Sequence, residues 1–133
     1  ASAQTLGPTA MPEWEPITEQ ALRDRVTQGV ARMSSSQLGL WSAIRIEPEK
    51  WVQRPYGDAG SGFWAVAVIG RTVIWYNDIE EGFNRSTYTS YGEIEEYWCN
   101  QDELELTVEY LMNSIDRGTD LVLMRSKTQK VPR

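Results

Sequence analysis

The most strongly apolar part of the chain predicts two neighbouring β-strands, Phe63 to Ile69 and Thr72 to Asn77. Gly70 and Arg71 join them, and glycine at the first central position is what a type II′ hairpin turn requires. Both strands carry apolar residues at consecutive positions, so they would present apolar side chains to both faces of a sheet. We therefore expect them to lie centrally, with other parts of the chain packed on each side.

Two stretches repeat apolar residues at the spacing of an amphipathic helix. The first predicts a helix from about residue 18 to residue 33, with Thr18 as its N-cap. The second predicts a helix from about residue 101 to residue 116, with Asn100 as its N-cap and Gly118 at the C-cap position. The two apolar stripes consist of Leu22, Val26, Val30 and Met33, and of Leu104, Val108, Leu111, Met112 and Ile115.

The sequence between the first helix and the hairpin predicts shorter elements. Ser34 to Ser36 break or re-cap the chain, after which Gln37 to Trp41 could form a further helical turn. Ala43 to Ile46 predicts a short strand, and Pro48 ends it because proline has no amide hydrogen to give to a sheet.

The remaining stretches predict two loops and two more strands. Tyr56 to Gly62 and Gly82 to Tyr91 have the composition of loops. Gly92 to Trp98 places Ile94 and Trp98 among charged residues and predicts a half-exposed strand. Leu121 to Met124 could form a last strand at an edge of the sheet.

Together these elements predict one α+β domain over residues 14–124, an antiparallel sheet of about four strands packed with two amphipathic helices. A chain of 133 residues suits one such domain. Residues 1–13 are small, polar and interrupted by proline, which predicts a disordered leader. Residues 125–133 form a basic tail.

The charge of the chain favours a basic partner. The net charge is −6, and without the four basic residues of the tail 9 basic residues face 19 acidic ones, a net charge of −10. An acidic body repels phosphate backbones, so we expect no direct binding of nucleic acid. The longest apolar run, Ala65 to Ile69, is far shorter than the roughly 20 residues of a membrane-spanning helix, so we expect no membrane insertion.

The chain has no histidine, and Cys99 is its only cysteine. This composition excludes an intramolecular disulfide and any zinc site built on cysteine or histidine, and it removes the commonest general base. We therefore expect neither cofactor nor metal, and no enzyme activity. The lack of disulfides fits a reducing cytoplasm, whereas the opening Ala1-Ser2-Ala3 leaves open an exported protein whose signal sequence has been removed.

The candidate functional residues directly follow the apolar hairpin. They are Trp75, Tyr76, Asp78, Glu80 and Glu81. Tryptophan and tyrosine are enriched at surfaces that recognise other proteins, and acidic residues at the rim can steer a basic partner toward such a surface. The carboxylates could instead hold calcium or magnesium. The segment lacks the alternating oxygen donors and central glycine of an EF-hand loop, so a metal site is the weaker interpretation.

Tryptophan and tyrosine are unusually frequent, with six residues of each. Trp64 and Trp75 lie in the hairpin and are predicted to be core residues. Trp14, Trp51 and Trp98 lie at the ends of elements, where half-burial is normal. In a loop, Arg54 and Tyr56 flank Pro55 and are weaker candidates for function.

The runs VIWYNDIEEGFN, EYWCNQDEL and LWSAIRIEPEKW resemble segments of a family of small uncharacterised bacterial proteins. This resemblance covers about residues 14–116 and implies no activity. In size, acidity and predicted layout the chain is also similar to the small α+β immunity proteins that neutralise bacterial toxins. That similarity is general, so it assigns no role to individual residues.

Our leading hypothesis from the sequence is a non-catalytic protein-interaction module with an acidic, aromatic recognition surface, of which a toxin-immunity protein would be one form. Aromatic anchors would supply affinity, and acidic residues at the rim would attract a basic protein partner. One alternative is a small-ligand-binding protein or an enzyme that uses carboxylates and tyrosines around a pocket. Another is a structural subunit of a larger assembly.

Overall fold

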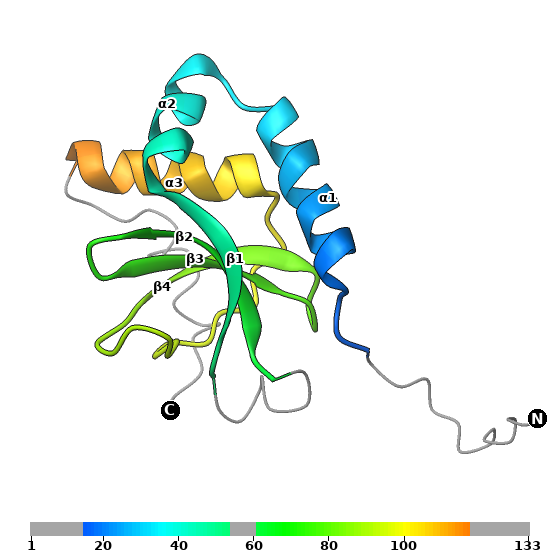
Figure 1. Cartoon of the computed structure of the whole chain (residues 1–133). Helices are drawn as coiled ribbons and strands as arrows, with labels where there is room; N and C mark the ends of the chain where they lie inside the picture. The colour runs from blue at the N-terminus through cyan, green and yellow to red at the C-terminus, as the bar shows by residue number, and fades with distance from the viewer. Residues whose placement is uncertain (1–14, 54–60, 118–133) are drawn as a thin grey trace, which may run out of the picture.

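The protein is described from a computed structural model, which covers residues 15–53 and 61–117. In these residues three helices and four strands follow one another along the chain (Figure 1). The strands form one antiparallel sheet in the order β1-β2-β3-β4, which confirms the predicted α+β domain. The elements are α1 (Glu19–Ala31), α2 (Ser35–Ile44), β1 (Arg45–Trp51), β2 (Phe63–Ile69), β3 (Thr72–Asn77), β4 (Gly82–Thr87) and α3 (Leu104–Arg117).

The central hairpin β2–β3 begins and ends at the predicted residues. Gly70 has a φ of +58° and Arg71 is not left-handed, which is the pattern of a type II′ turn. Ala65 pairs with Trp75 whereas Ala67 pairs with Ile74, so β2 contains one extra residue, a β-bulge. The bulge turns two consecutive residues, Val66 and Ala67, to the same face of the sheet.

The three helices gather on one face of the sheet, as Figure 1 shows. The buried cluster on this face joins all three helices to β2, β3 and β4. α1 approaches α3 closely because Gly29 has no side chain: a Cβ atom there would lie 2.8 Å from Cβ of Leu104. The buried members of this helix-side core are Leu22, Met33, Trp41, Ile44, Val66, Ala67, Ile74, Tyr76, Phe83, Leu104, Val108 and Leu111.

An irregular stretch, residues 88–99, covers the opposite face of the sheet, and we call it the covering segment. The strand predicted over Gly92 to Trp98 is wrong, because the segment forms isolated bridges, such as that between Val52 and Glu93, and no continuous strand. Its apolar side chains turn inward instead of alternating along a sheet edge. The buried members of this loop-side core are Trp51, Phe63, Ala65, Val73, Trp75, Ile94 and Tyr97.

The stretch before the hairpin differs from its prediction at two points. α2 extends through Ile44, because Ser34 and Gln37 form a capping box that starts a full helix. β1 then continues through Pro48 and does not end before it. Proline is tolerated there because β1 is an edge strand, and its register with β2 shifts between Arg45 and Glu49.

Two further boundaries also differ. Gly82–Thr87, predicted as part of a loop, forms β4 because β3 offers it a complete row of backbone partners, from Asn77 with Gly82 to Thr72 with Thr87. The last helix begins at Leu104 and not near residue 101. Asn100 is not its N-cap, because it lies four residues before Leu104; its backbone amide instead donates to Oδ1 of Asn84.

Burial corrects the prediction for two tryptophans. Trp51 and Trp98 are only 1% and 2% exposed, although their positions at the ends of elements predicted half-burial. Trp75 is fully buried as predicted, and Trp64 is half-buried with Nζ of Lys50 5.1 Å from its ring centre. The inward-facing covering segment therefore turns apparent edge positions into core.

Several predictions fall outside the described residues. They concern the leader, Trp14, the loop with Arg54 and Tyr56, Gly118, the strand Leu121 to Met124 and the basic tail. Over residues 15–53 and 61–117, no helix combines the length and the apolar content needed to cross a membrane.

Candidate functional site

The predicted site residues lie at and beside the tight turn between β3 and β4, which the side chain of Asn77 organises. Its Oδ1 accepts hydrogen bonds from the backbone amides of Ile79 at 3.0 Å and Glu80 at 3.1 Å. Its backbone carbonyl accepts from the amide of Glu81 at 2.7 Å. An asparagine that caps the following amides stabilises a turn, so this acidic stretch has one defined shape.

The end of the turn is held against the chain just before α3. Glu81 has a φ of +62°, a left-handed conformation that is uncommon outside glycine. At Gly82 a Cβ atom would lie 2.3 Å from Cα of Gln101, so only glycine fits there. Nδ2 of Asn77 donates to the carbonyl of Trp98 at 3.0 Å, and Nε2 of Gln101 donates to that of Glu80 at 3.0 Å.

A second asparagine completes this attachment. Oδ1 of Asn84 accepts from the amide of Asn100 at 3.0 Å, while its Nδ2 donates to the carbonyl of Asn100 at 3.1 Å. The amide of Phe83 donates to the carbonyl of Asp102 at 2.8 Å. Sequence reasoning missed both asparagines, since no local pattern shows which distant backbone a buried amide will contact. The only signal was that two runs chosen for their resemblance, VIWYNDIEEGFN and EYWCNQDEL, turn out to lie together.

The two aromatic candidates are scaffold residues. Trp75 is fully buried in the loop-side core, where its Nε1 donates to Oγ of Ser86 at 2.9 Å. Tyr76 is buried in the helix-side core with its ring 4.9 Å from that of Phe83, and burial raises the pKa of its hydroxyl. Both rings are almost wholly buried, so both hold the turn in place, and Tyr76 also contributes to the wall of a hollow beside the turn.

Asp78 joins the turn to the chain entering α1. Its Oδ2 accepts a hydrogen bond from the amide of Ile17 at 2.8 Å, and the residue is only 8% exposed. Burial raises the pKa of this carboxyl above its usual value, although the hydrogen bond from Ile17 opposes the shift. Asp78 is therefore committed to the fold more than to an open surface.

Glu80 and Glu81 are the candidates that remain accessible. Glu81 is exposed and Glu80 half-exposed. Within the described part of the chain, ion pairs join Arg23 to Glu19 and Glu47, and Arg32 to Glu103 and Glu105, but none includes these two residues. Among the described residues, these two carboxylates therefore form no ion pair on a turn whose backbone has one defined shape.

A hollow of about 170 Å³ adjoins the turn. Among the described residues that line this hollow, Arg25 is the one cation, and its guanidinium carbon lies 5.5 Å from the centre of the Tyr76 ring. Three carboxylates outnumber it, so the hollow favours a positively charged side chain from outside. The lining consists of Glu15, Ile17, Arg25, Tyr76, Asp78 and Glu81.

The arrangement provides neither a metal centre nor an activated thiol. In residues 15–53 and 61–117, no three acidic or cysteine side chains form a group that could hold a metal ion. Cys99 is half-buried, and burial together with the nearby Glu80 raises the pKa of its thiol, which lowers its reactivity. The chemistry offered here is charge attraction and hydrogen bonding.

Comparison of the chain with protein-family models, with curated proteins and with solved structures gives no match. The resemblance to toxin-immunity proteins therefore stays a prediction, and the function is argued from the site alone.

Proposed function

We propose that this protein is a non-catalytic interaction module that binds a basic segment of a partner protein at the β3–β4 turn. The observation that supports it most directly is the position of Glu80 and Glu81 on a turn whose backbone is held in one shape, with no ion pair to either carboxylate among the described residues. A backbone that is already held in place loses little conformational freedom on binding, so more of the attraction between the charges appears as affinity.

The charge of the whole chain supports the same partner chemistry. With 19 acidic residues against 13 basic ones, the protein attracts a cationic partner from a distance, and such steering raises association rates at low salt. The acidic turn would then orient the partner on arrival. A small basic toxin is one partner with this chemistry, and a toxin gene beside the gene for this protein would support that more specific form of the proposal.

The hollow beside the turn gives the partner a point of attachment. A lysine or arginine side chain entering it would meet the carboxylates of Glu15 and Glu81, and its apolar stem could lie along Ile17. Asp78 shapes the wall from its buried position. Trp75 acts in this proposal through the rigidity of the turn, and Tyr76 does so while also forming part of the wall of the hollow.

The test is a comparison of two double charge reversals in capture experiments from the native host. Glu80→Lys with Glu81→Lys should weaken capture of the partner at least about tenfold and flatten the dependence of binding on salt. Glu93→Lys with Glu95→Lys changes the net charge equally on the covering segment and should retain most of the binding. Equal losses of binding in both variants would mean that the turn acts only through the net charge of the protein, which would contradict a specific site there. Unchanged binding by Glu80→Lys with Glu81→Lys would overturn the proposal.

A further inference from the structure

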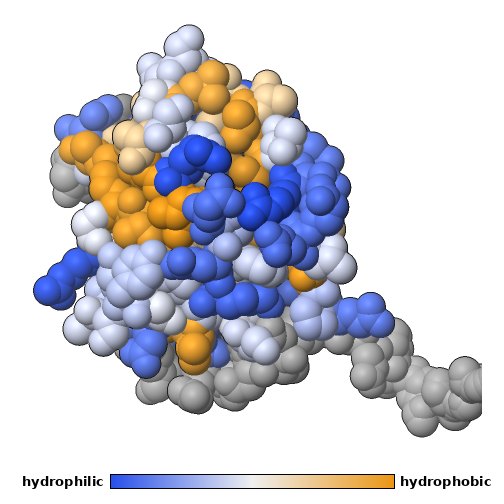
Figure 2. Space-filling view, in the orientation of Figure 1, coloured by the Kyte–Doolittle hydropathy of each residue, from blue (hydrophilic) through white to orange (hydrophobic). Residues whose placement is uncertain are grey.

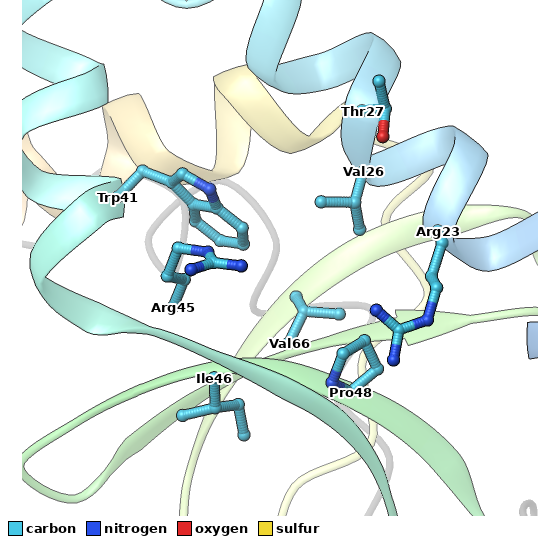
Figure 3. A pocket seen from close by; sticks show the side chains of 8 residues that line it. All are labelled: Arg23, Val26, Thr27, Trp41, Arg45, Ile46, Pro48 and Val66. Atoms are coloured by element: carbon cyan, nitrogen blue, oxygen red, sulfur yellow. The ribbon is translucent and has the colours of Figure 1, made fainter.

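A second hollow, of about 130 Å³, lies between α1, the end of α2 and the edge strand β1 (Figure 3). It is separate from the acidic turn and shares no lining residue with the hollow there. α1 packs mainly against α3, and this leaves a space between α1 and the edge strand β1. In Figure 2 the apolar surface on the side of α2 meets the hydrophilic surface of α1 on this face of the molecule.

The floor of this hollow is apolar, whereas Thr27 and two arginines add polar groups to its walls. Val66 and Trp41 belong to the helix-side core, and Val26 and Pro48 lie beside them. Ile46 also borders the hollow, but its side chain points away from it and packs against the loop-side core. Val66 is the extra residue of the β2 bulge, so the irregularity of that strand supplies the floor. An apolar recess of this size suits one ring or one branched chain, since a cavity of about 150 Å³ accommodates benzene.

Two guanidinium groups stand over the apolar floor, and they differ in their partners. Arg23 is held by Glu19 at 2.9 Å and by Glu47 at 3.0 Å. The side chain of Arg45 has no ion pair or hydrogen bond within the described part of the chain. In Figure 3 the two groups lie on either side of Val66, that of Arg45 beside Trp41 and that of Arg23 beside Pro48.

We infer that this hollow binds a small monocarboxylate with a compact apolar body. The body would fill the recess over Val66 and Trp41, and the carboxylate would pair with Arg45, whose planar fork of donors matches two carboxylate oxygens. Arg23 adds positive potential from the opposite side. Glu47, already bound to Arg23, disfavours a second negative charge on the ligand, which selects against dicarboxylates.

The full chain can be titrated with benzoate while its amide NMR spectrum is recorded. Two matched probes separate the two halves of the proposed ligand: benzamide keeps the ring without the charge, and acetate keeps the charge without the ring. We expect saturable benzoate shifts centred on Val26, Ile46 and Val66, with both other probes binding at least about tenfold more weakly. Equal binding of benzamide would exclude recognition of the carboxylate, and equal binding of acetate would exclude recognition of the apolar body.

Variants then test the residues. Arg45→Gln should weaken benzoate at least about tenfold, and it should leave the fold intact because the side chain is exposed and unpaired. Val26→Leu adds volume at the wall and should weaken benzoate while Arg45 stays in place. Arg71→Gln removes the same charge from the β2–β3 turn and is the control that should bind as the natural chain does. Undiminished binding by Arg45→Gln, or shifts centred elsewhere, would overturn the inference.

Discussion

The two faces of the sheet are covered by different kinds of structure and are filled by different side chains. Among the described residues, three of the twelve buried members of the helix-side core are aromatic, compared with four of seven in the loop-side core. Helices present aliphatic side chains in regular rows that interlock with a sheet. The irregular covering segment offers no such rows, so a few large rings fill the space and reach across it.

The faces differ equally in how backbone polar groups are satisfied. A helix bonds its own amides and carbonyls, whereas an irregular segment packed on a sheet must find partners elsewhere. Here side chains provide them: Asn77 bonds to Trp98, Asn84 to Asn100, and Oγ of Ser86 donates to the carbonyl of Glu96 at 2.7 Å. The side chain of Asn77 that bonds the carbonyl of Trp98 also bonds the backbone amides of the acidic turn. The turn is therefore held in one shape by the same residue that attaches the covering segment.

The largest expected effect comes from removing the central ring of the loop side. Trp75→Ala should lower the free energy of unfolding by about 3–5 kcal/mol, because truncation of a buried tryptophan leaves a large cavity. A domain stabilised by roughly 5–15 kcal/mol would then be close to unfolding. Chemical denaturation followed by far-UV circular dichroism measures the change.

Leu104→Ala makes the matching cavity on the helix side and should cost about 2–5 kcal/mol, toward the lower end if the helices close over it. Trp75→Phe keeps an aromatic ring in the core but removes the hydrogen bond to Ser86. This variant should keep most of the stability that Trp75→Ala loses. A cost below about 1 kcal/mol for Trp75→Ala would mean that the loop side is not a true core.

The next effect tests the hydrogen bonds that hold the covering segment. Asn77→Asp keeps the oxygen that organises the turn but replaces the donor to Trp98 with a second oxygen, which repels that carbonyl. A buried charge without its donor should cost about 2–3 kcal/mol at neutral pH. Hydrogen exchange should quicken in the covering segment while α1 and α3 stay protected.

Acid should reverse part of this loss. Burial raises the folded-state pKa of the new carboxyl in Asn77→Asp, so the folded state binds the proton more tightly and stability rises as pH falls. Gln101→Glu removes a similar donor, to the carbonyl of Glu80, at an exposed position where water replaces it, so its effect should stay within about 0.5 kcal/mol. Equal costs for the two substitutions would argue against the importance of burial.

The sequence predicted the centre of the sheet well because that region is determined locally. Continuous apolar runs define β2 and β3, and Gly70 imposes the turn between them. The N-cap at Thr18 was likewise predictable, since its Oγ1 accepts from the amide of Ala21 three residues away. Each of these features depends on residues close together in the chain.

Partners distant in the chain decided what the sequence did not predict. β4 has few apolar residues and exists because β3 pairs with it, and Pro48 is accepted because β1 lies at an edge. For the candidate site, the acidic stretch lies at the turn that directly follows the predicted hairpin, but the burial of Trp75 and Tyr76 depends on the covering segment and on α3. No pattern within the stretch itself distinguishes a ring that faces solvent from one that faces another segment.

The smallest expected effect lies at the outer edge of the loop side. Tyr91 is 61% exposed, yet its hydroxyl donates to Oε2 of Glu49 at 2.5 Å, and this hydrogen bond, with some burial, raises its pKa to about 12. At pH 11 its ring should be about one tenth ionised, whereas an ordinary tyrosine with a pKa near 10 would be about nine tenths ionised. The associated stability is complete below pH 10 and is lost as pH rises toward 12, because only the folded state keeps the proton in that window.

NMR titration of isotope-labelled tyrosine rings measures the pKa of Tyr91. Glu49→Gln should restore an ordinary pKa, while Glu93→Gln should not. If the pKa of Tyr91 in the natural chain were not raised, its hydrogen bond to Glu49 would not persist in solution. The ordered packing of the loop side would then end at Trp51 and would not include Tyr91.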